Sequence, residues 1–205
     1  MRRGKFITVE GIDGAGKSSH LEFLCARVRA KGHGVLLTRE PGGTPIGEQL
    51  RKMVLHQPMP AVAEALLMFG ARSLHVNDVI EPALEAGTWV ICDRFSDSSF
   101  AYQCGGRGLD THVVANLEAL VHPALQPDAT YLFDVDPATA YERQRKEGRS
   151  PDVFEREQVA FFERVREAYL ERSRQQLYRF HIIDASGTPE MVRSILAAEF
   201  ERTFA

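Results

Sequence analysis

The sequence predicts an α/β protein in which a five-stranded parallel sheet lies between two layers of helices, as a three-layer sandwich. Five short apolar runs, at 6–10, 35–39, 89–93, 130–135 and 180–184, alternate with helical patterns. The runs are almost continuously apolar, which is typical of strands buried on both faces of a parallel sheet. Strands that alternate with helices also require right-handed crossovers, which place helices on both faces of the sheet.

The helical patterns follow the strands in order, and each has an apolar face. In the first pattern, Leu21, Leu24, Cys25 and Val28 lie on one side of the helix. The predicted helices span 19–31, 47–55, 61–86, 111–121, 137–146, 154–176 and 189–204. No repeat, low-complexity tract or long linker divides the 205 residues, so we expect one domain over 1–205.

The composition excludes several classes of function. A formal net charge of −3 argues against a basic surface that binds nucleic acid. Cys25, Cys92 and Cys104 have no C-x-x-C spacing, so we predict neither a zinc site nor a disulfide framework. No apolar segment has the length of a membrane span or a signal peptide. We therefore expect a cytoplasmic protein with no nucleic-acid or membrane partner.

The segment 11–18 fits the phosphate-binding loop pattern G-x-x-x-x-G-K-[ST]. Glycines in this pattern let the backbone approach a phosphate closely, Lys17 brings a cation to it, and the Ser18 hydroxyl can ligate Mg²⁺. A predicted strand precedes the loop and a predicted helix follows it, so the helix N-terminus adds its dipole to anion binding. The sequence therefore predicts a site for ATP or GTP, formed by Gly11, Ile12, Asp13, Gly14, Ala15, Gly16, Lys17, Ser18 and Ser19.

Polar residues end several of the predicted strands. Glu10, Arg39, Asp93 with Arg94, and Asp134 all follow apolar runs. The carboxyl ends of parallel strands meet at one edge of the sheet, where ligands bind. We expect Asp93 to support Mg²⁺ and Arg94 to bridge two phosphates with its planar fork. A Pro-Gly-Gly turn would hold Arg39 at the same edge, near a second phosphate.

Three further segments carry side chains suited to a ligand. Phe69 and Arg72 are three residues apart on one predicted helix, so ring and guanidinium could approach one flat ligand, although core packing is the common role of a helical phenylalanine. The segment 98–103 adds hydroxyls, a phenol and an amide, and we expect a flexible glycine-rich loop at 105–108. The basic segment 141–149 is either a solvated helix face or a lid over phosphates. We assign no role to the seven histidines.

These motifs, in this order, resemble those of the bacterial thymidylate kinases, a family that phosphorylates dTMP to dTDP with MgATP. The matching segments are 10–18, 38–44, 67–72, 93–94, 98–103 and 105–108, and they extend over most of the chain. The resemblance implies a P-loop nucleoside monophosphate kinase fold and a homodimer. The extensive apolar surface of the predicted helix 61–86 favours dimerisation through that helix.

The resemblance also implies roles for individual residues. Lys17 and the loop amides would hold the ATP phosphates, with Ser18 near Mg²⁺. A lid at 142–153 would supply a catalytic arginine from among Arg143, Arg145 and Arg149. A set of motif positions would bind dTMP: Asp13 at the sugar 3′-hydroxyl, Arg39 and Arg94 at the phosphate, Phe69 stacked on thymine, Arg72 at a base carbonyl, Ser99 and Gln103 reading the pyrimidine, and Tyr102 crowding the sugar 2′ position.

The reaction of this family needs no catalytic base, because the acceptor is already an anionic phosphate oxygen. The difficulty is the repulsion between two anions, which Lys17, Arg94, a lid arginine and Mg²⁺ would screen. The sequence departs from the family at three places. The segment 152–155 lacks the arginine of the family's lid element, 56–60 is short and proline-rich, and Phe95 stands where tyrosine or histidine is common.

Two other functions fit the phosphate loop. A deoxynucleoside kinase shares it but needs a carboxylate base at a strand end, where this chain has Asp93 and Arg94. A nucleotide-dependent switch or scaffold also shares it but needs no small acceptor. A small ring-shaped ligand, and therefore the kinase of dTMP, better explains one cluster of residues: Phe69, Arg72, Ser99, Tyr102 and Gln103.

Overall fold

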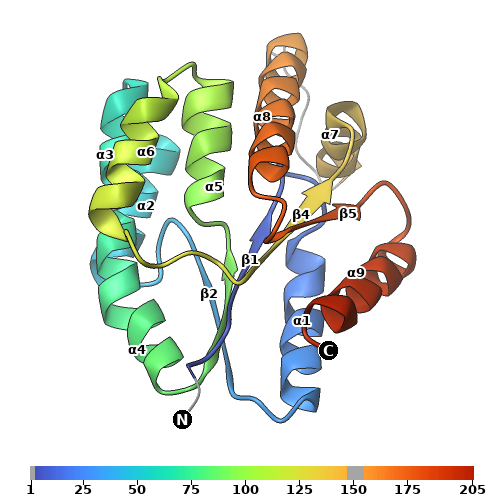
Figure 1. Cartoon of the computed structure of the whole chain (residues 1–205). Coiled ribbons are helices and arrows are strands. Elements are labelled where there is room, and N and C mark those ends of the chain that lie inside the picture. Colours follow the sequence, from blue (N-terminus) through green and yellow to red (C-terminus); the bar gives the residue numbers. More distant parts are fainter. Residues whose placement is uncertain (1–2, 147–154) are drawn as a thin grey trace.

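The computed structural model describes residues 3–146 and 155–205, and of 144–146 and 155–158 it describes the backbone alone. Its centre is a parallel sheet with the strand order β2-β3-β1-β4-β5 (Figure 1). The strands are β1 (Phe6–Glu10), β2 (Val35–Arg39), β3 (Trp89–Asp93), β4 (Ala129–Asp134) and β5 (Phe180–Asp184). The predicted class and all five predicted strands are confirmed, with β4 shifted by one residue.

Helices connect the strands and cover the sheet (Figure 1). In Figure 1, α2, α3 and α6 gather on one side of the view, and α7 and α9 lie on the other. In chain order, the helices are α1 (Ser18–Ala30), α2 (Pro45–His56), α3 (Ala61–His75), η1 (Val76–Ile80), α4 (Glu81–Glu85), α5 (Ser96–Ser99), η2 (Phe100–Gly106), α6 (Thr111–Val121), α7 (Pro137–Lys146), α8 (Glu155–Gln175) and α9 (Pro189–Thr203). Within the described ranges, no helix is long and apolar enough to cross a membrane.

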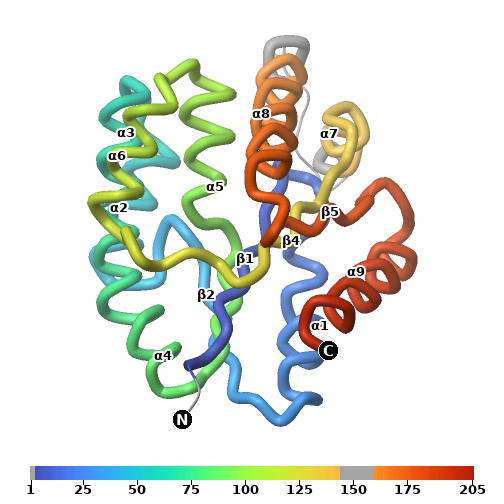
Figure 2. Tube along the Cα trace, viewed as in Figure 1, coloured from blue at the N-terminus to red at the C-terminus, as the bar shows by residue number. Residues whose placement is uncertain are grey.

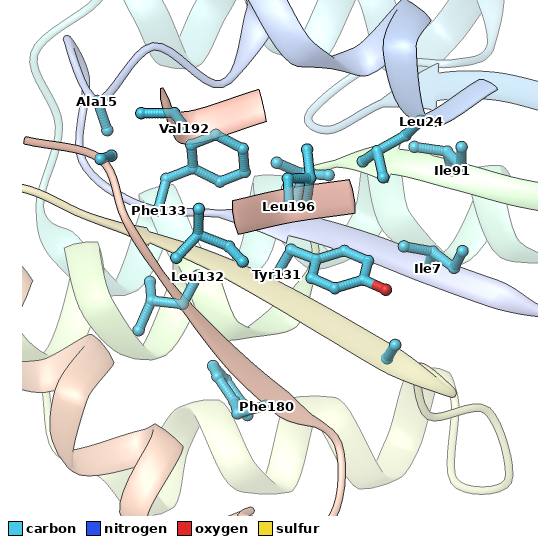
Figure 3. Packing of buried hydrophobic residues seen from close by; sticks show 14 of the residues in the cluster. Ile7, Ala15, Leu24, Ile91, Tyr131, Leu132, Phe133, Phe180, Val192 and Leu196 are labelled. Atoms are coloured by element: carbon cyan, nitrogen blue, oxygen red, sulfur yellow. The ribbon is translucent and has the colours of Figure 1, made fainter. Parts of the chain in front are cut away.

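Neighbouring residues of a strand face opposite layers, as the two-residue period of a strand requires. Phe6 packs with Ile80 of η1, whereas Ile7 belongs to the cluster that contains Leu24 of α1 and Leu196 of α9. In Figure 3, Phe133 of β4 points toward α9, and Phe180 lies across the strands from it. The chain ends beside α1 (Figure 2). Both faces of the sheet are therefore buried, which explains its apolar strands.

The predicted helix 61–86 is continuous in space but irregular. It consists of α3, the π-helical turn η1 and the short helix α4, which contains Pro82. A π-helical turn shifts the helical face, because each of its hydrogen bonds spans one more residue than in an α-helix. The 3.6-residue pattern of apolar residues carries no sign of this shift.

The prediction of a flexible loop at 105–108 is wrong for its first two residues, and the helix that contains them was not predicted. Gly105 and Gly106 lie in η2, which packs on α8. A Cβ atom at Gly105 would lie 2.4 Å from the Cβ of Ala168, and one at Gly106 would lie 2.4 Å from Cε2 of Phe161. These glycines therefore permit two helices to approach closely, and they do not provide flexibility.

Candidate active site

A cavity of about 890 Å³ opens at the carboxyl edge of the sheet. This volume lies in the range of ligand sites. The phosphate-binding loop, α2, α3, η2 and the segment after β5 all contribute to its wall. Its lining residues are Asp13–Ser19 with His20, Arg39–Pro41, Arg51, Val54, Leu55, Glu64, Met68, Asp93, Arg94, Ser98, Tyr102, Gln103, Arg143, Ala185, Gly187, Pro189 and Val192.

The loop between β1 and α1 has the backbone that its sequence predicts. Gly11, Gly14 and Gly16 have φ values of 135°, 83° and 84°, which favour glycine over other residues. A Cβ at Gly11 would lie 2.5 Å from the carbonyl oxygen of Phe133, so no larger residue fits there. The helix α1 begins at Ser18, directly after the loop. Its N-terminal dipole and free amides therefore face the cavity that the loop lines.

Lys17 is buried at the base of this loop. Its Nζ donates hydrogen bonds to the carbonyl oxygens of Gly11 and Ile12, at 3.0 and 3.1 Å. Burial and the nearby guanidinium of Arg94 lower the pKa of Lys17 to about 8. The ammonium is only partly compensated by two carbonyl dipoles, so an anionic ligand would stabilise it strongly.

Asp93 ends β3 beside the loop. Its Oδ1 is buried and has no hydrogen-bond partner among the described residues. Such an atom normally needs a partner, so it marks a place for a cation or for water that a cation binds. Ser18 lines the same cavity. No group of three His, Cys, Asp or Glu side chains that suits a metal occurs in the described parts of the chain, and Mg²⁺ needs none, since it takes most of its ligands from phosphates and water.

Arg94 is held in the cavity wall by four hydrogen bonds. Its Nη2 donates to Asp13 at 2.7 Å and to the Tyr102 hydroxyl at 3.0 Å. Its Nη1 donates to the hydroxyl groups of Ser98 and Tyr169, at 3.2 and 3.0 Å. The Arg94 φ of 70° is positive, which is unusual for a residue with a side chain and is often found at functional sites. Arg94 also joins the phosphate loop to η2, a link that the sequence did not reveal.

Glu10 lies beneath Arg94 and is fully buried. It accepts hydrogen bonds from the Ser98 and Tyr169 hydroxyl groups, at 2.6 and 2.8 Å, and from the Phe95 amide at 2.7 Å. Burial, and next the charge of Asp97, raise the pKa of Glu10 to about 7. Two of the three hydroxyl groups that bind Arg94, those of Ser98 and Tyr169, are thus anchored to Glu10. The sequence placed Glu10 at a strand end but indicated no role for it.

Arg39 reaches the cavity as predicted, and a second arginine accompanies it. Arg39 lines the cavity and forms an ion pair with Glu48 of α2, at 2.9 Å. Arg51, one turn further along α2, also lines the cavity and donates to the Pro41 carbonyl at 2.8 Å. Arg51 was missed, because a cation on an amphipathic helix usually faces solvent.

Phe69, Arg72 and Ser99 lie behind the cavity wall. The Arg72 guanidinium lies over the Phe69 ring, 4.3 Å from its centroid, and both residues are 1% exposed. Arg72 donates to Glu40 at 2.6 Å and to the Ser99 hydroxyl at 3.2 Å. Ring and guanidinium therefore lie together, as their spacing on one helix face predicts, while their approach to a flat ligand stays a prediction. A planar ligand could contact this pair only if the side chains that cover it moved aside.

Tyr102 and Gln103, by contrast, line the cavity directly. Gln103 donates from Nε2 to the Glu64 carboxylate at 2.8 Å, and its Oε1 is buried without a partner in the described structure. Burial raises the pKa of Tyr102 to about 12, so its hydroxyl stays protonated and can donate. An unpaired acceptor and a neutral phenol thus belong to neighbouring residues of one wall.

Of the three predicted lid arginines, Arg143 is the one whose side chain the structure describes. Its guanidinium donates to the carbonyl oxygens of Ala185, Ser186 and Gly187, at 2.8, 3.0 and 3.2 Å, and it lines the cavity. The side chain of Arg145 and the whole of Arg149 lie outside the described residues, as do most of the predicted lid 142–153 and the divergent segment before Glu155.

Known proteins resemble the chain over nearly its full length. A family model described as thymidylate kinase matches residues 9–195. A thymidylate kinase of Bordetella pertussis is 55% identical over 197 residues, which cover 96% of this chain and 94% of the relative. One from Methylobacillus flagellatus is 53% identical over 191 residues, covering 93% and 94%. The crystal structure of thymidylate kinase from Ehrlichia chaffeensis is 31% identical, with a TM-score of 0.77 over 97% of this chain and 99% of that one.

Proposed function

The chain belongs to the thymidylate kinase family, and we propose how its residues carry out the phosphorylation of dTMP by ATP. The activity follows from the family, and the fold is the P-loop nucleoside monophosphate kinase fold. The assignment of residues rests on one observation above all: the phosphate-binding loop and Arg94 line the same cavity and are joined by the Asp13–Arg94 ion pair. Donor and acceptor phosphates would therefore meet there.

The donor site is the end of the cavity formed by the loop, α1, Arg143 and the segment after β5. Lys17 and the backbone of 11–18, with Ser19, would bind the ATP phosphates. Arg143 binds the carbonyl groups of 185–187 and so shapes this wall. These hydrogen bonds favour a positioning role for Arg143 over direct contact with the transferred phosphoryl group. Arg145 and Arg149 remain the other candidates for the catalytic lid arginine.

The acceptor phosphate would lie between Arg94, Arg39 and Arg51. All three line the cavity, and Arg94 presents a planar fork that suits two phosphate oxygens. Asp13 would bind the sugar 3′-hydroxyl, and the Tyr102 hydroxyl would lie near the 2′ position. The acceptor oxygen is already anionic, so these cations act by orienting it and by neutralising charge as the two phosphates approach.

Ser18 and Asp93 would hold Mg²⁺, directly or through water. The unpartnered Oδ1 of Asp93 and the hydroxyl of Ser18 fit a cation that takes oxygen ligands. When bound, Mg²⁺ would neutralise charge on the ATP phosphates.

The pyrimidine would lie on the wall formed by Met68, Tyr102 and Gln103. Phe69 would stack on it, and Arg72 and Ser99 would bind its polar edge, once the side chains that cover them move.

The exposed apolar residues Val62 and Leu66 on α3, 47% and 54% exposed, support a homodimer through this helix. A sedimentation measurement at micromolar concentration that gave a 23 kDa particle would contradict the dimer. A single domain and a cytoplasmic location stay predictions from sequence.

An acceptor screen tests the proposal. Purified protein with MgATP is expected to turn over dTMP and to leave thymidine unreacted, because thymidine lacks the phosphate that three arginines would bind. Phe69→Ala and Arg72→Ala are each expected to raise the KM for dTMP at least about tenfold with a smaller change in kcat. Unchanged KM values in both variants would show that the base binds elsewhere, and turnover of thymidine would contradict the acceptor site itself.

The pKa of Lys17 leads to a pH prediction. Below pH 8 the ammonium of the free enzyme is charged, and above pH 8 its charge is lost, since its pKa is about 8. We expect kcat/KM for ATP to be level below this pH and to fall about tenfold for each further pH unit above it. In Lys17→Arg the guanidinium stays charged, so any remaining activity should not show this fall. A wild-type profile that stays level well above the pKa of about 8 would contradict the assignment.

A further inference from the structure

Glu64 lines the cavity and pairs with Arg107, and neither residue has been given a role so far. Glu64, in the first turn of α3, lines the cavity and is 6% exposed. Its Oε1 accepts the Gln103 Nε2 hydrogen bond at 2.8 Å, and its Oε2 lies 3.0 Å from Nε of Arg107. Arg107 follows η2 directly and belongs to the glycine-rich motif 105–108, for which the sequence indicated no function beyond flexibility.

The carboxylate of Glu64 determines which end of the Gln103 amide faces the cavity. A carboxylate accepts hydrogen bonds and has no proton to donate, so it requires the nitrogen of the amide on its own side. The amide oxygen must then point the other way, and Gln103 Oε1 is indeed the buried atom without a partner among the described residues. Gln103 lines the cavity, so a base that binds against it would meet this oxygen as an unpaired acceptor.

We propose that the Glu64–Arg107 pair is a specificity device that selects a pyrimidine with an N3–H donor, such as thymine or uracil, and rejects cytosine. This inference rests on the proposed placement of the base against Gln103. The N3 atom of a cytosine ring is an acceptor, so it would face the Gln103 oxygen with two lone pairs opposed and no proton between them. A site built around a hydrogen bond rejects strongly a ligand that leaves its buried group unpaired.

Arg107 holds the Glu64 carboxylate in the ionised form that the Gln103 orientation requires. A guanidinium only donates, so it keeps one carboxylate oxygen of Glu64 occupied, and it also neutralises the charge of a carboxylate that is buried. Glu64 and Arg107 do not contact the reacting phosphates in this arrangement. They are positioning residues that act through Gln103.

In the Glu64→Gln variant we expect the Gln103 amide to turn over, so that its oxygen and nitrogen exchange places. Arg107 would still donate, so the oxygen of the introduced amide would face Arg107 and its nitrogen would face Gln103. Gln103 would then accept from that nitrogen and turn its own Nε2 toward the cavity, where it suits cytosine. We expect the ratio of kcat/KM for dTMP to that for dCMP to fall at least about tenfold, mainly through KM. In Glu64→Asp, which has no proton to donate, the ratio should stay within about threefold of wild type.

The experiment measures kcat and KM for dTMP, dUMP and dCMP in wild type, Glu64→Gln and Glu64→Asp, with thermal unfolding of each. Glu118→Gln is a matched control, because it removes the carboxylate of another ion pair, with Arg172 at 3.2 Å, outside the cavity lining. Its ratio should equal that of wild type. Equal ratios in Glu64→Gln and wild type would overturn the inference while leaving the proposed dTMP site intact.

Wild-type enzyme supplies a second test that depends on no variant. dCMP should be disfavoured against both dTMP and dUMP by at least about a hundredfold in kcat/KM, because both preferred bases carry the N3–H donor. Discrimination of dCMP by less than about tenfold would overturn the inference. A failure of wild type to use dTMP at all would instead contradict the proposed function.

Discussion

Replacing Lys17 with methionine is expected to lower kcat about a thousandfold without lowering the thermal unfolding midpoint. The lysine is 7% exposed, and burial lowers its pKa to about 8, so its charge costs the folded protein stability and does not add to it. Methionine has a similar length and is at home in a buried position. The charge is needed when the phosphoryl group transfers and negative charge gathers on its oxygens, and removal of one such contact typically costs two to three orders of magnitude in rate.

The measurement is steady-state kinetics with saturating ATP and dTMP, beside a thermal melt of the same sample. Lys5→Met is the matched control. Lys5 precedes β1, at the end of the strand opposite to the loop that carries Lys17, and it pairs with Asp128 there. It should retain nearly full kcat. If Lys17→Met kept more than about a tenth of the wild-type kcat, Lys17 would have no central part in phosphoryl transfer.

The sequence predicted those parts of the site that follow from strand order and backbone geometry. Asp93 and Arg94 end one buried strand, and the phosphate loop follows its neighbour, so the sheet brings them to one edge. The glycines of the loop need positive φ values, and Gly14 and Gly16 have them. Both inferences rest on local residues and on the direction of parallel strands, which a sequence reveals.

Other parts of the site depend on contacts between distant segments, and the sequence does not reveal them. The helix that contains Tyr102 and Gln103 has few apolar residues in regular spacing, and it is stabilised by packing on α8, a helix that follows much later in the chain. Glu64 looks like an ordinary acidic residue in the first turn of a helix, where the dipole favours it. Its pairing with Gln103 and Arg107 becomes visible only once the fold brings these residues together.

The predicted spacing of Phe69 and Arg72 was informative in part. It places the two side chains on one helix face, and the Arg72 guanidinium does lie over the ring. The sequence could not indicate that Glu40 of the neighbouring turn draws Arg72 inward. Burial alone would raise the pKa of Glu40, yet Arg72 and His75 hold it below its ordinary value, so the Glu40–Arg72 pair is ionised and tightly held.

Replacing Arg94 with lysine is expected to lower kcat about a hundredfold and to raise the KM for dTMP about tenfold. The guanidinium makes four hydrogen bonds to side chains from distant parts of the chain, which fix its plane beside the phosphate loop. A lysine keeps the charge but is a point donor, so it cannot hold Asp13 and the two tyrosine hydroxyl groups and also bind two phosphate oxygens. Kinetics with varied dTMP would separate the loss in KM from the loss in kcat.

A comparison with Arg166→Lys shows whether the activity depends on the planar shape of the Arg94 side chain or on its charge alone. Arg166 makes a two-pronged pair with Asp134, at 2.6 and 2.9 Å, and is absent from the lining of the large cavity. The same substitution there should change kcat less than about twofold. If Arg94→Lys matched wild type, a positive charge alone would suffice at this position, and the hydrogen-bond network from Glu10 through Ser98 and Tyr169 would have no part in orienting the acceptor. If Arg94→Lys loses kcat as expected, the network beneath it is part of the machinery, because it fixes the plane in which the fork meets the acceptor phosphate.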